Sequence, residues 1–118
     1  MTYRTKRVET EIQRMRFPVD VEDVTAFETG APLTLKFPIT GHKAVLGPNY
    51  PFQKPTMTVD GEDMVVYLMR YKIATNSDIE CPCCMLQFQD WSPTMTLQDL
   101  INDFLRVKQL IDEKKVLP

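Results

Sequence analysis

The sequence predicts one α+β domain over residues 1–118, in which helices cover one antiparallel sheet. Three observations predict this fold class: helical spacing of apolar residues near the N-terminus, strict alternation in the middle, and a wide apolar helix face near the C-terminus. At 118 residues, the chain is long enough to form one domain with its own hydrophobic core.

The first element is a helix over residues 2–16. Val8, Ile12 and Met15 recur at helical spacing, and the pair Phe17-Pro18 ends the run. The other faces of this helix are rich in lysine and arginine. We expect them to be either an ordinary solvated surface or a docking surface for an acidic partner.

Short strands follow between residues 19 and 73. Leu33, Leu35 and Phe37 alternate with polar residues, which is the period of a half-buried strand. Val19, Val21 and Val24 predict a first strand that begins within residues 19–24. The whole stretch predicts a series of short antiparallel strands.

The end of the meander is predicted to be a hairpin. Asp60-Gly61 lies between two apolar runs, and this dipeptide favours a tight hairpin turn. The flanking strands are expected at Met57–Val59 and Met64–Met69. Residues 74–90 show no clear period, so the sequence predicts a long loop there, of the kind that is usually functional.

Residues 97–113 form the second helix, which the sequence predicts most clearly. Its apolar residues make a wide face, Thr96 is a suitable N-cap, and Asp99 lies three residues later as in a capping box. The wide face indicates that this helix packs on the sheet.

Composition excludes several classes of function. The net charge of −2 gives no sign of nucleic-acid binding, and no apolar run approaches the roughly 18 residues of a membrane span. The N-terminal residues lack the apolar core of a signal peptide. We therefore expect a cytoplasmic or nuclear protein without cofactors, whose cysteines are thiols rather than disulfides.

All three cysteines of the chain fall in the segment Cys81-Pro82-Cys83-Cys84. One interpretation is a reactive thiol, since a thiolate is the nucleophile of cysteine chemistry. A second is a structural zinc site, because Cys81 and Cys84 have the spacing of a zinc half-site. Such a site needs four ligands, and His42, the single histidine, is expected in a surface turn. A third is a buried, merely structural cluster.

The order of motifs resembles the ubiquitin-conjugating enzyme family. The segment Tyr50-Pro51-Phe52-Gln53-Lys54-Pro55 resembles the proline loop of that family, and Trp91-Ser92-Pro93 with the following helix resembles its second loop. The cysteine run before the tryptophan is similar to that of divergent members from protists and large DNA viruses. The resemblance implies an N-terminal helix, a four-stranded meander, an active-site loop and a C-terminal helix.

The resemblance also implies a reaction. A cysteine takes the C-terminal carbonyl of ubiquitin, or of a ubiquitin-like modifier, from an activating enzyme as a thioester and passes it to a lysine or a ligase. Cys83 lies eight residues before Trp91, as in short-loop members, so it is the favoured nucleophile, with Cys81 and Cys84 kept open. Asn76 is the candidate oxyanion donor or else an ordinary turn residue.

In the family, the first helix and the two loops together bind the activating enzyme and ubiquitin ligases. Carried over to this chain, the expected partner-binding residues are Arg4, Lys6, Arg7, Phe52, Pro93 and Thr94.

The sequence departs from the family in lacking the His-Pro-Asn triplet before the cysteine and a pattern of further helices after residue 113. Two alternatives therefore stay open. One is a catalytically inactive variant that acts as a binding module, and the other is a zinc-stabilised adaptor.

Overall fold

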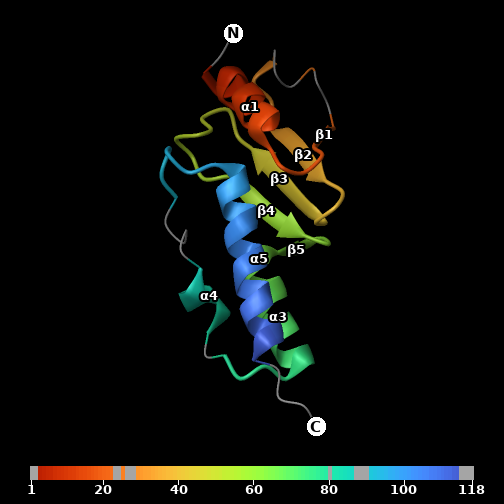
Figure 1. Ribbon diagram of the computed structural model, residues 1–118. Coiled ribbons are helices and arrows are strands. Elements are labelled where there is room, and N and C mark those ends of the chain that lie inside the picture. The colour runs from red at the N-terminus through yellow and green to blue at the C-terminus, as the bar shows by residue number, and fades with distance from the viewer. Residues whose placement is uncertain (1–2, 23–24, 26–28, 80, 87–90, 115–118) are drawn as a thin grey trace.

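The computed structural model describes residues 3–22, 25, 29–79, 81–86 and 91–114 of the chain (Figure 1). The side chains of Tyr3 and Cys83 lie outside this description. The helices and strands are, in chain order, α1 (Tyr3–Arg14), β1 (Asp20–Val21), β2 (Leu33–Phe37), β3 (His42–Leu46), β4 (Thr56–Val59), β5 (Glu62–Asp63), α3 (Met64–Thr75), α4 (Pro82–Met85) and α5 (Leu97–Glu113). The α+β class predicted from the sequence is confirmed.

The sheet is an antiparallel meander of five strands in the order β1-β2-β3-β4-β5, rather than the predicted four. Of the five strands, β3 and β5 were not predicted from the sequence, and β1 and β5 are short, with only two residues each. Val24, which was expected in the first strand, lies outside the described residues. In the centre of the sheet, Leu35 pairs with Ala44, and Ala44 pairs with Met57.

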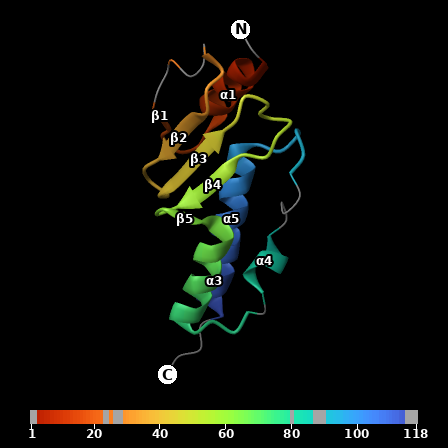
Figure 2. The same cartoon turned by 180° about the vertical axis from the view of Figure 1, so that it is seen from behind.

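One face of the sheet is apolar and is covered by helices. Leu33, Leu35 and Phe37 of β2 are fully buried, which confirms the alternation predicted from the sequence. In Figure 1, α1 and the first turns of α5 lie over this face, whereas Figure 2 shows the uncovered face. The core contains Val8, Leu33, Leu35, Phe37, Ala44, Leu46, Tyr50, Met57, Leu97, Leu100 and Ile101.

The predicted hairpin turn at Asp60-Gly61 is confirmed. Asp60 has a φ of 50° and Gly61 a φ of 87°, and a two-residue hairpin turn with both residues in the left-handed region favours this dipeptide. Val59 pairs with Glu62 directly across the turn.

The prediction of a strand over Met64–Met69 is wrong, because these residues begin the helix α3, which continues to Thr75. The carboxylate of Asp63 accepts hydrogen bonds from the backbone N–H groups of Val65 at 3.0 Å and Val66 at 3.4 Å. This cap ends β5 and starts the helix. A run of six apolar residues fits a buried helix as well as a strand, so apolar character alone did not separate them.

The segment 74–90, predicted to be one long loop, also contains helical residues. Its first two residues belong to α3, and α4 forms a single turn at Pro82–Met85. Residues 80 and 87–90 lie outside the described residues.

The helix predicted at residues 97–113 is confirmed with the same bounds. Thr96 and Asp99 form the expected capping box, since each side chain accepts a hydrogen bond from the other residue's backbone N–H. The helix continues beyond the sheet and packs against α3 in a second core of Val59, Leu68, Ile79, Phe104, Val107 and Ile111. The molecule is therefore elongated, with extents of 55 × 25 × 21 Å.

Replacing Asp63 with alanine is expected to lower the free energy of unfolding by about 1 kcal/mol, because two N–H groups of α3 lose their side-chain acceptor. Urea unfolding followed by circular dichroism measures this change. Asp20→Ala is the matched control, since Asp20 is also an exposed aspartate in a two-residue strand but does not cap a helix. Equal effects of the two substitutions would contradict the capping role of Asp63.

Candidate functional site

Glu11 joins three separate elements at one end of the molecule. Its carboxylate is buried and accepts hydrogen bonds from the Tyr50 hydroxyl, from Nε of Arg7 at 2.9 Å and from the backbone N–H of Leu97 at 2.7 Å. These donors come from the proline loop, from α1 itself and from the start of α5. Burial, together with the charge of Glu11, raises the pKa of Tyr50 well above its usual range, so this phenol stays protonated.

Trp91 connects the two loops directly. Its indole Nε1 donates a hydrogen bond to the Pro51 carbonyl at 2.6 Å, and its ring lies 5.8 Å from the ring of Tyr50. The peptide bond between Tyr50 and Pro51 is cis. Arg7 donates to the carbonyl of Met95 at 2.5 Å and so ties α1 to the second loop. We call α1 and residues 50–55 and 91–96 the loop platform.

The loop platform presents several of the expected partner-binding residues to solvent. Phe52 is 66% exposed, and Lys6, Pro93 and Thr94 are exposed as well. Arg7 is half-buried, and its guanidinium already bonds within the platform. The large apolar side chain of Phe52 therefore stands on a backbone that its neighbours fix in place.

Arg4 does not fit the role of a docking residue. Only 2% of it is exposed, and its Nη1 donates to the carbonyls of Ala31 at 2.7 Å and Leu46 at 3.2 Å. Burial lowers the pKa of Arg4 from its usual value. The prediction for Arg4 is corrected accordingly, because this side chain holds α1 to the sheet and the neighbouring loop.

A cleft of about 320 Å³, lined by residues with polar side chains, opens between α1 and the second loop. Its lining residues are Arg7, Thr10, Glu11, Arg14, Thr94, Thr96 and Gln98. The guanidinium of Arg14 forms no hydrogen bond or ion pair with another described residue. The cleft thus offers a cationic group and hydroxyl groups to a polar or acidic group of a partner.

The cysteines lie on and beside α4, away from the loop platform. Cys81 is the N-cap residue and half-buried, and Cys84 is exposed, with its backbone N–H bonded to the Cys81 carbonyl at 3.1 Å. Neither forms a disulfide bond with another described residue. The side chain of Cys83, the favoured nucleophile, lies outside what the structure describes.

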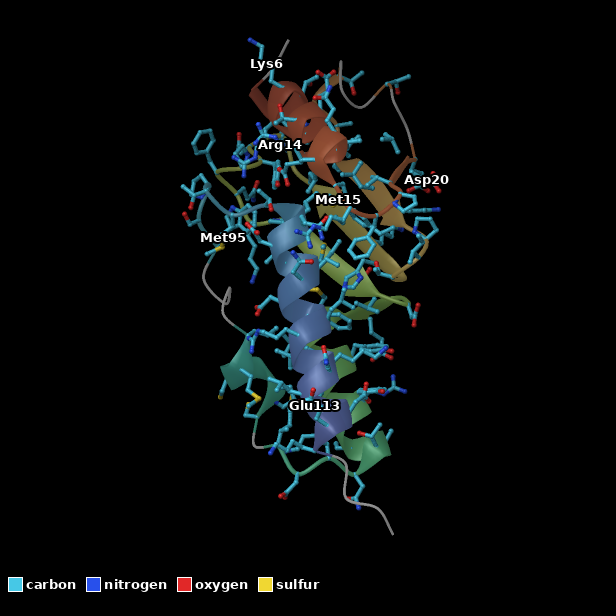
Figure 3. All side chains as sticks on the ribbon, viewed as in Figure 1. Lys6, Arg14, Met15, Asp20, Met95 and Glu113 are labelled. Atoms are coloured by element: carbon cyan, nitrogen blue, oxygen red, sulfur yellow. The ribbon has the colours of Figure 1, made fainter. Side chains whose placement is uncertain are left out.

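Contacts with α5 fix the position of α4. The guanidinium of Arg106 donates to the carbonyl of Met85 and to the carboxylate of Asp103. Figure 3 shows α4 beside the lower half of α5, whereas the labelled Arg14 and Met95 lie at its upper end. The structure therefore does not bring the thiols of Cys81 and Cys84 next to the loop platform.

Asn76 is the C-cap residue of α3. Its backbone is left-handed, with φ 55° and ψ 45°, and its N–H donates to the carbonyl of Ile73 at 3.1 Å. Asparagine is one of the residues that adopt this conformation most readily. The exposed Asn76 thus serves α3 as a cap, which is the turn role left open by the sequence.

His42 is buried, not in a surface turn as predicted from the sequence. It is 2% exposed in β3, opposite Phe37, and its ring meets the edge of Phe104 at 4.7 Å. Its Nδ1 lies 2.8 Å from the hydroxyl of Thr40. Among the described residues, no group of three or more His, Cys, Asp or Glu side chains is arranged to hold a metal ion.

Sequence reasoning missed Glu11, the residue that organises the loop platform. The one signal was its position four residues after Arg7 on a helix, where opposite charges pair. That spacing is common on solvated helices and gave no indication of the contacts with Tyr50 and Leu97.

Comparisons with known proteins found no matching family model, no matching curated protein and no matching solved structure. Within the described part of the chain, no helix has the length and apolar character needed to cross a membrane.

Proposed function

We propose that this chain is a ubiquitin-conjugating protein that carries ubiquitin or a ubiquitin-like modifier as a cysteine thioester. The observation that carries the proposal is the loop platform. The resemblance implies that the first helix, the proline loop and the Trp-Ser-Pro loop bind partners as one surface. In this chain Glu11 and Trp91 hold those three segments together.

The exposed side chains of the loop platform suit a protein partner. Phe52 offers a large apolar anchor, and exposed aromatic residues on a fixed backbone are typical of binding hot spots. Lys6 and Arg14 add positive charge to the loop platform, which favours acidic surfaces of an activating enzyme or a ligase.

The proposed chemistry needs one thiol from residues 81–84. Its thiolate attacks the carbonyl of the modifier's thioester on the activating enzyme, so a new C–S bond forms while the old one breaks and the enzyme's cysteine leaves as a thiolate. A lysine amine then attacks the new thioester and loses a proton, and the thiol of this chain is released. Cys84 is exposed as a nucleophile must be, and Cys83 has the spacing that the resemblance favours.

A charging assay tests this function. The protein is mixed with activating enzyme, ATP and ubiquitin, and non-reducing gels should show a band heavier by one ubiquitin that disappears on addition of reductant. Of the substitutions Cys81→Ser, Cys83→Ser and Cys84→Ser, one should abolish the band. Phe52→Ala should slow charging about tenfold or more by removing an anchor of at least about 1.4 kcal/mol, whereas Ile39→Ala should not. Ile39 is equally exposed, at 68%, but lies outside the loop platform.

A second candidate function is an inactive binding module, and two observations favour it. Asn76 is the cap of α3, and α4, with Cys84 on it and Cys81 at its N-cap, lies along α5 rather than beside the loop platform. This candidate would be favoured if the folded protein forms no charged band but still binds the activating enzyme. Phe52→Ala should then weaken that binding. Charging that survives all three serine substitutions would exclude the thioester mechanism in this segment.

A further inference from the structure

Cys81 and Cys84 lie at the two ends of a single helical turn. Cys81 is the N-cap residue of α4, and the backbone N–H of Cys84 donates to the Cys81 carbonyl at 3.1 Å. In a helical turn, Cα atoms three positions apart are separated by about 5 Å. A disulfide bond spans Cα separations of about 4.4–6.8 Å. The backbone of α4 therefore holds these two residues at the separation that a disulfide requires.

The spacing of the cysteines favours this pair over the other two pairs. Positions three apart on a helix are neighbours, whereas positions one or two apart do not face each other. Of the three cysteines in the chain, only Cys81 and Cys84 are three positions apart. The structure shows no disulfide between these two residues. It therefore shows the pair in the state from which an internal disulfide would form.

Pro82 and contacts with α5 fix the turn that connects the two cysteines. Pro82 is buried at the start of α4, and its ring restricts φ to about −65°. The carbonyl of Met85 accepts a hydrogen bond from Arg106 of α5, and the side chain of Met85 packs against the second core. Because the backbone is already ordered, closing the ring costs little further conformational entropy.

The exposure of the two residues indicates the order of the steps. The thiolate of the exposed Cys84 attacks one sulfur of glutathione disulfide, so a mixed disulfide forms and one glutathione leaves as a thiolate. The thiolate of the half-buried Cys81 then attacks the sulfur of Cys84, and the second glutathione leaves. The two leaving thiolates take up the protons that the cysteines lose. Two cysteine thiols are thus oxidised, and one glutathione disulfide is reduced to two glutathione thiols.

We propose that Cys81 and Cys84 form a reversible disulfide by exchange with glutathione disulfide. A disulfide that closes a short loop adds little stability, and exposed disulfides are the labile, regulatory ones. In a reducing compartment such bonds are transient and serve catalysis or the sensing of oxidants. The disulfide does not depend on the proposed function. One consequence rests on that function, since the bond withholds two of the three candidate nucleophiles from the modifier.

A titration of the full chain with mixtures of reduced and oxidised glutathione tests the proposal. Oxygen is excluded, the remaining thiols are alkylated at each ratio, and mass spectrometry of the intact protein counts the alkyl groups. As oxidised glutathione increases, the wild-type protein should lose two alkylation sites together without gaining glutathione at them. Excess reduced glutathione should restore both sites.

Serine substitutions identify the two cysteines. Cys83→Ser is the matched control, because it removes the neighbouring cysteine and should keep the internal disulfide. Cys81→Ser and Cys84→Ser should each lower the fraction of protein with an internal disulfide at least about tenfold, at the glutathione ratio that half-oxidises the control. Cys81→Ser should instead accumulate glutathione on Cys84, since the second thiol is missing. Circular dichroism checks that each variant is folded.

Two results would overturn the proposal. One is a wild-type protein that forms no internal disulfide at any glutathione ratio. The other is a disulfide that is lost in Cys83→Ser but kept in Cys81→Ser or Cys84→Ser. The titration contains neither activating enzyme nor ubiquitin, so its outcome is independent of the charging assay. A protein that charges with ubiquitin but forms no disulfide would retain the proposed function without the redox pair.

Discussion

Replacing Glu11 with alanine is expected to lower the free energy of unfolding by about 3 kcal/mol. The substitution leaves the buried Tyr50 hydroxyl, the Arg7 guanidinium and the N–H of Leu97 without their common acceptor. It also removes the bonds from α1 to the proline loop and to the start of α5, so the environment of Trp91, the single tryptophan, should change. Urea unfolding followed by tryptophan fluorescence and circular dichroism measures both effects.

Two further variants separate charge from hydrogen bonding. Glu11→Gln keeps a carbonyl acceptor of the same shape but loses the negative charge beside Arg7, so it should cost about half as much as alanine. Glu9→Ala removes an exposed carboxylate from the same helix and should stay within about 0.5 kcal/mol of wild type. If Glu11→Ala were as mild as Glu9→Ala, the carboxylate would not organise the loop platform.

Lowering the pH from 7 to 5 is expected to cost about 2 kcal/mol of stability through His42 alone. Burial lowers the pKa of His42 from 6.5 to about 4, while Asp60 acts to raise it and Lys108 to lower it further. Between these two values, the unfolded chain binds a proton that the folded protein excludes. Stability is therefore fully present above pH 6.5, falls as the pH drops, and has lost about 3 kcal/mol below pH 4.

Because His42 is the single histidine of the chain, its titration can be followed directly by NMR. In wild-type protein, the imidazole resonances of His42 should stay constant from pH 7 to pH 5 and titrate near pH 4. Between pH 7 and pH 5, the free energy of unfolding should fall by about 2 kcal/mol less in His42→Leu than in the wild-type protein. The substitution also removes the hydrogen bond between His42 and Thr40. A histidine that titrates near pH 6.5 in the folded protein would contradict a buried, neutral ring.

Some elements could be predicted because their signals are local. The bounds of α5 follow from the capping box of Thr96 and Asp99 and from an apolar face of helical period. The Asp60-Gly61 turn follows from the backbone conformations that this dipeptide tolerates. These features depend on neighbours within a few residues, so no knowledge of the tertiary structure was needed.

Other elements were mispredicted because the decisive contacts are distant in sequence. Met64–Met69 is apolar on both sides, so the spacing of its apolar residues did not distinguish a strand from a helix. The helix is the conformation in which Leu68 packs against α5. His42 was expected at the surface because the sequence placed it in a turn. Its place opposite Phe37 and against Phe104 depends on strand pairing and helix packing together.

By itself, the sequence determined the α+β class, the long C-terminal helix and the motifs that resemble a ubiquitin-conjugating enzyme. Only the tertiary structure determined which residues contact one another around those motifs. It buried Arg4 as a support of α1, made Glu11 the common acceptor of three elements, and placed α4 along α5 away from the loop platform. The physical reason is that a buried charge is stable only where its partners converge, and the carbonyl partners of Arg4 and the Tyr50 and Leu97 donors to Glu11 lie 27 to 86 residues away.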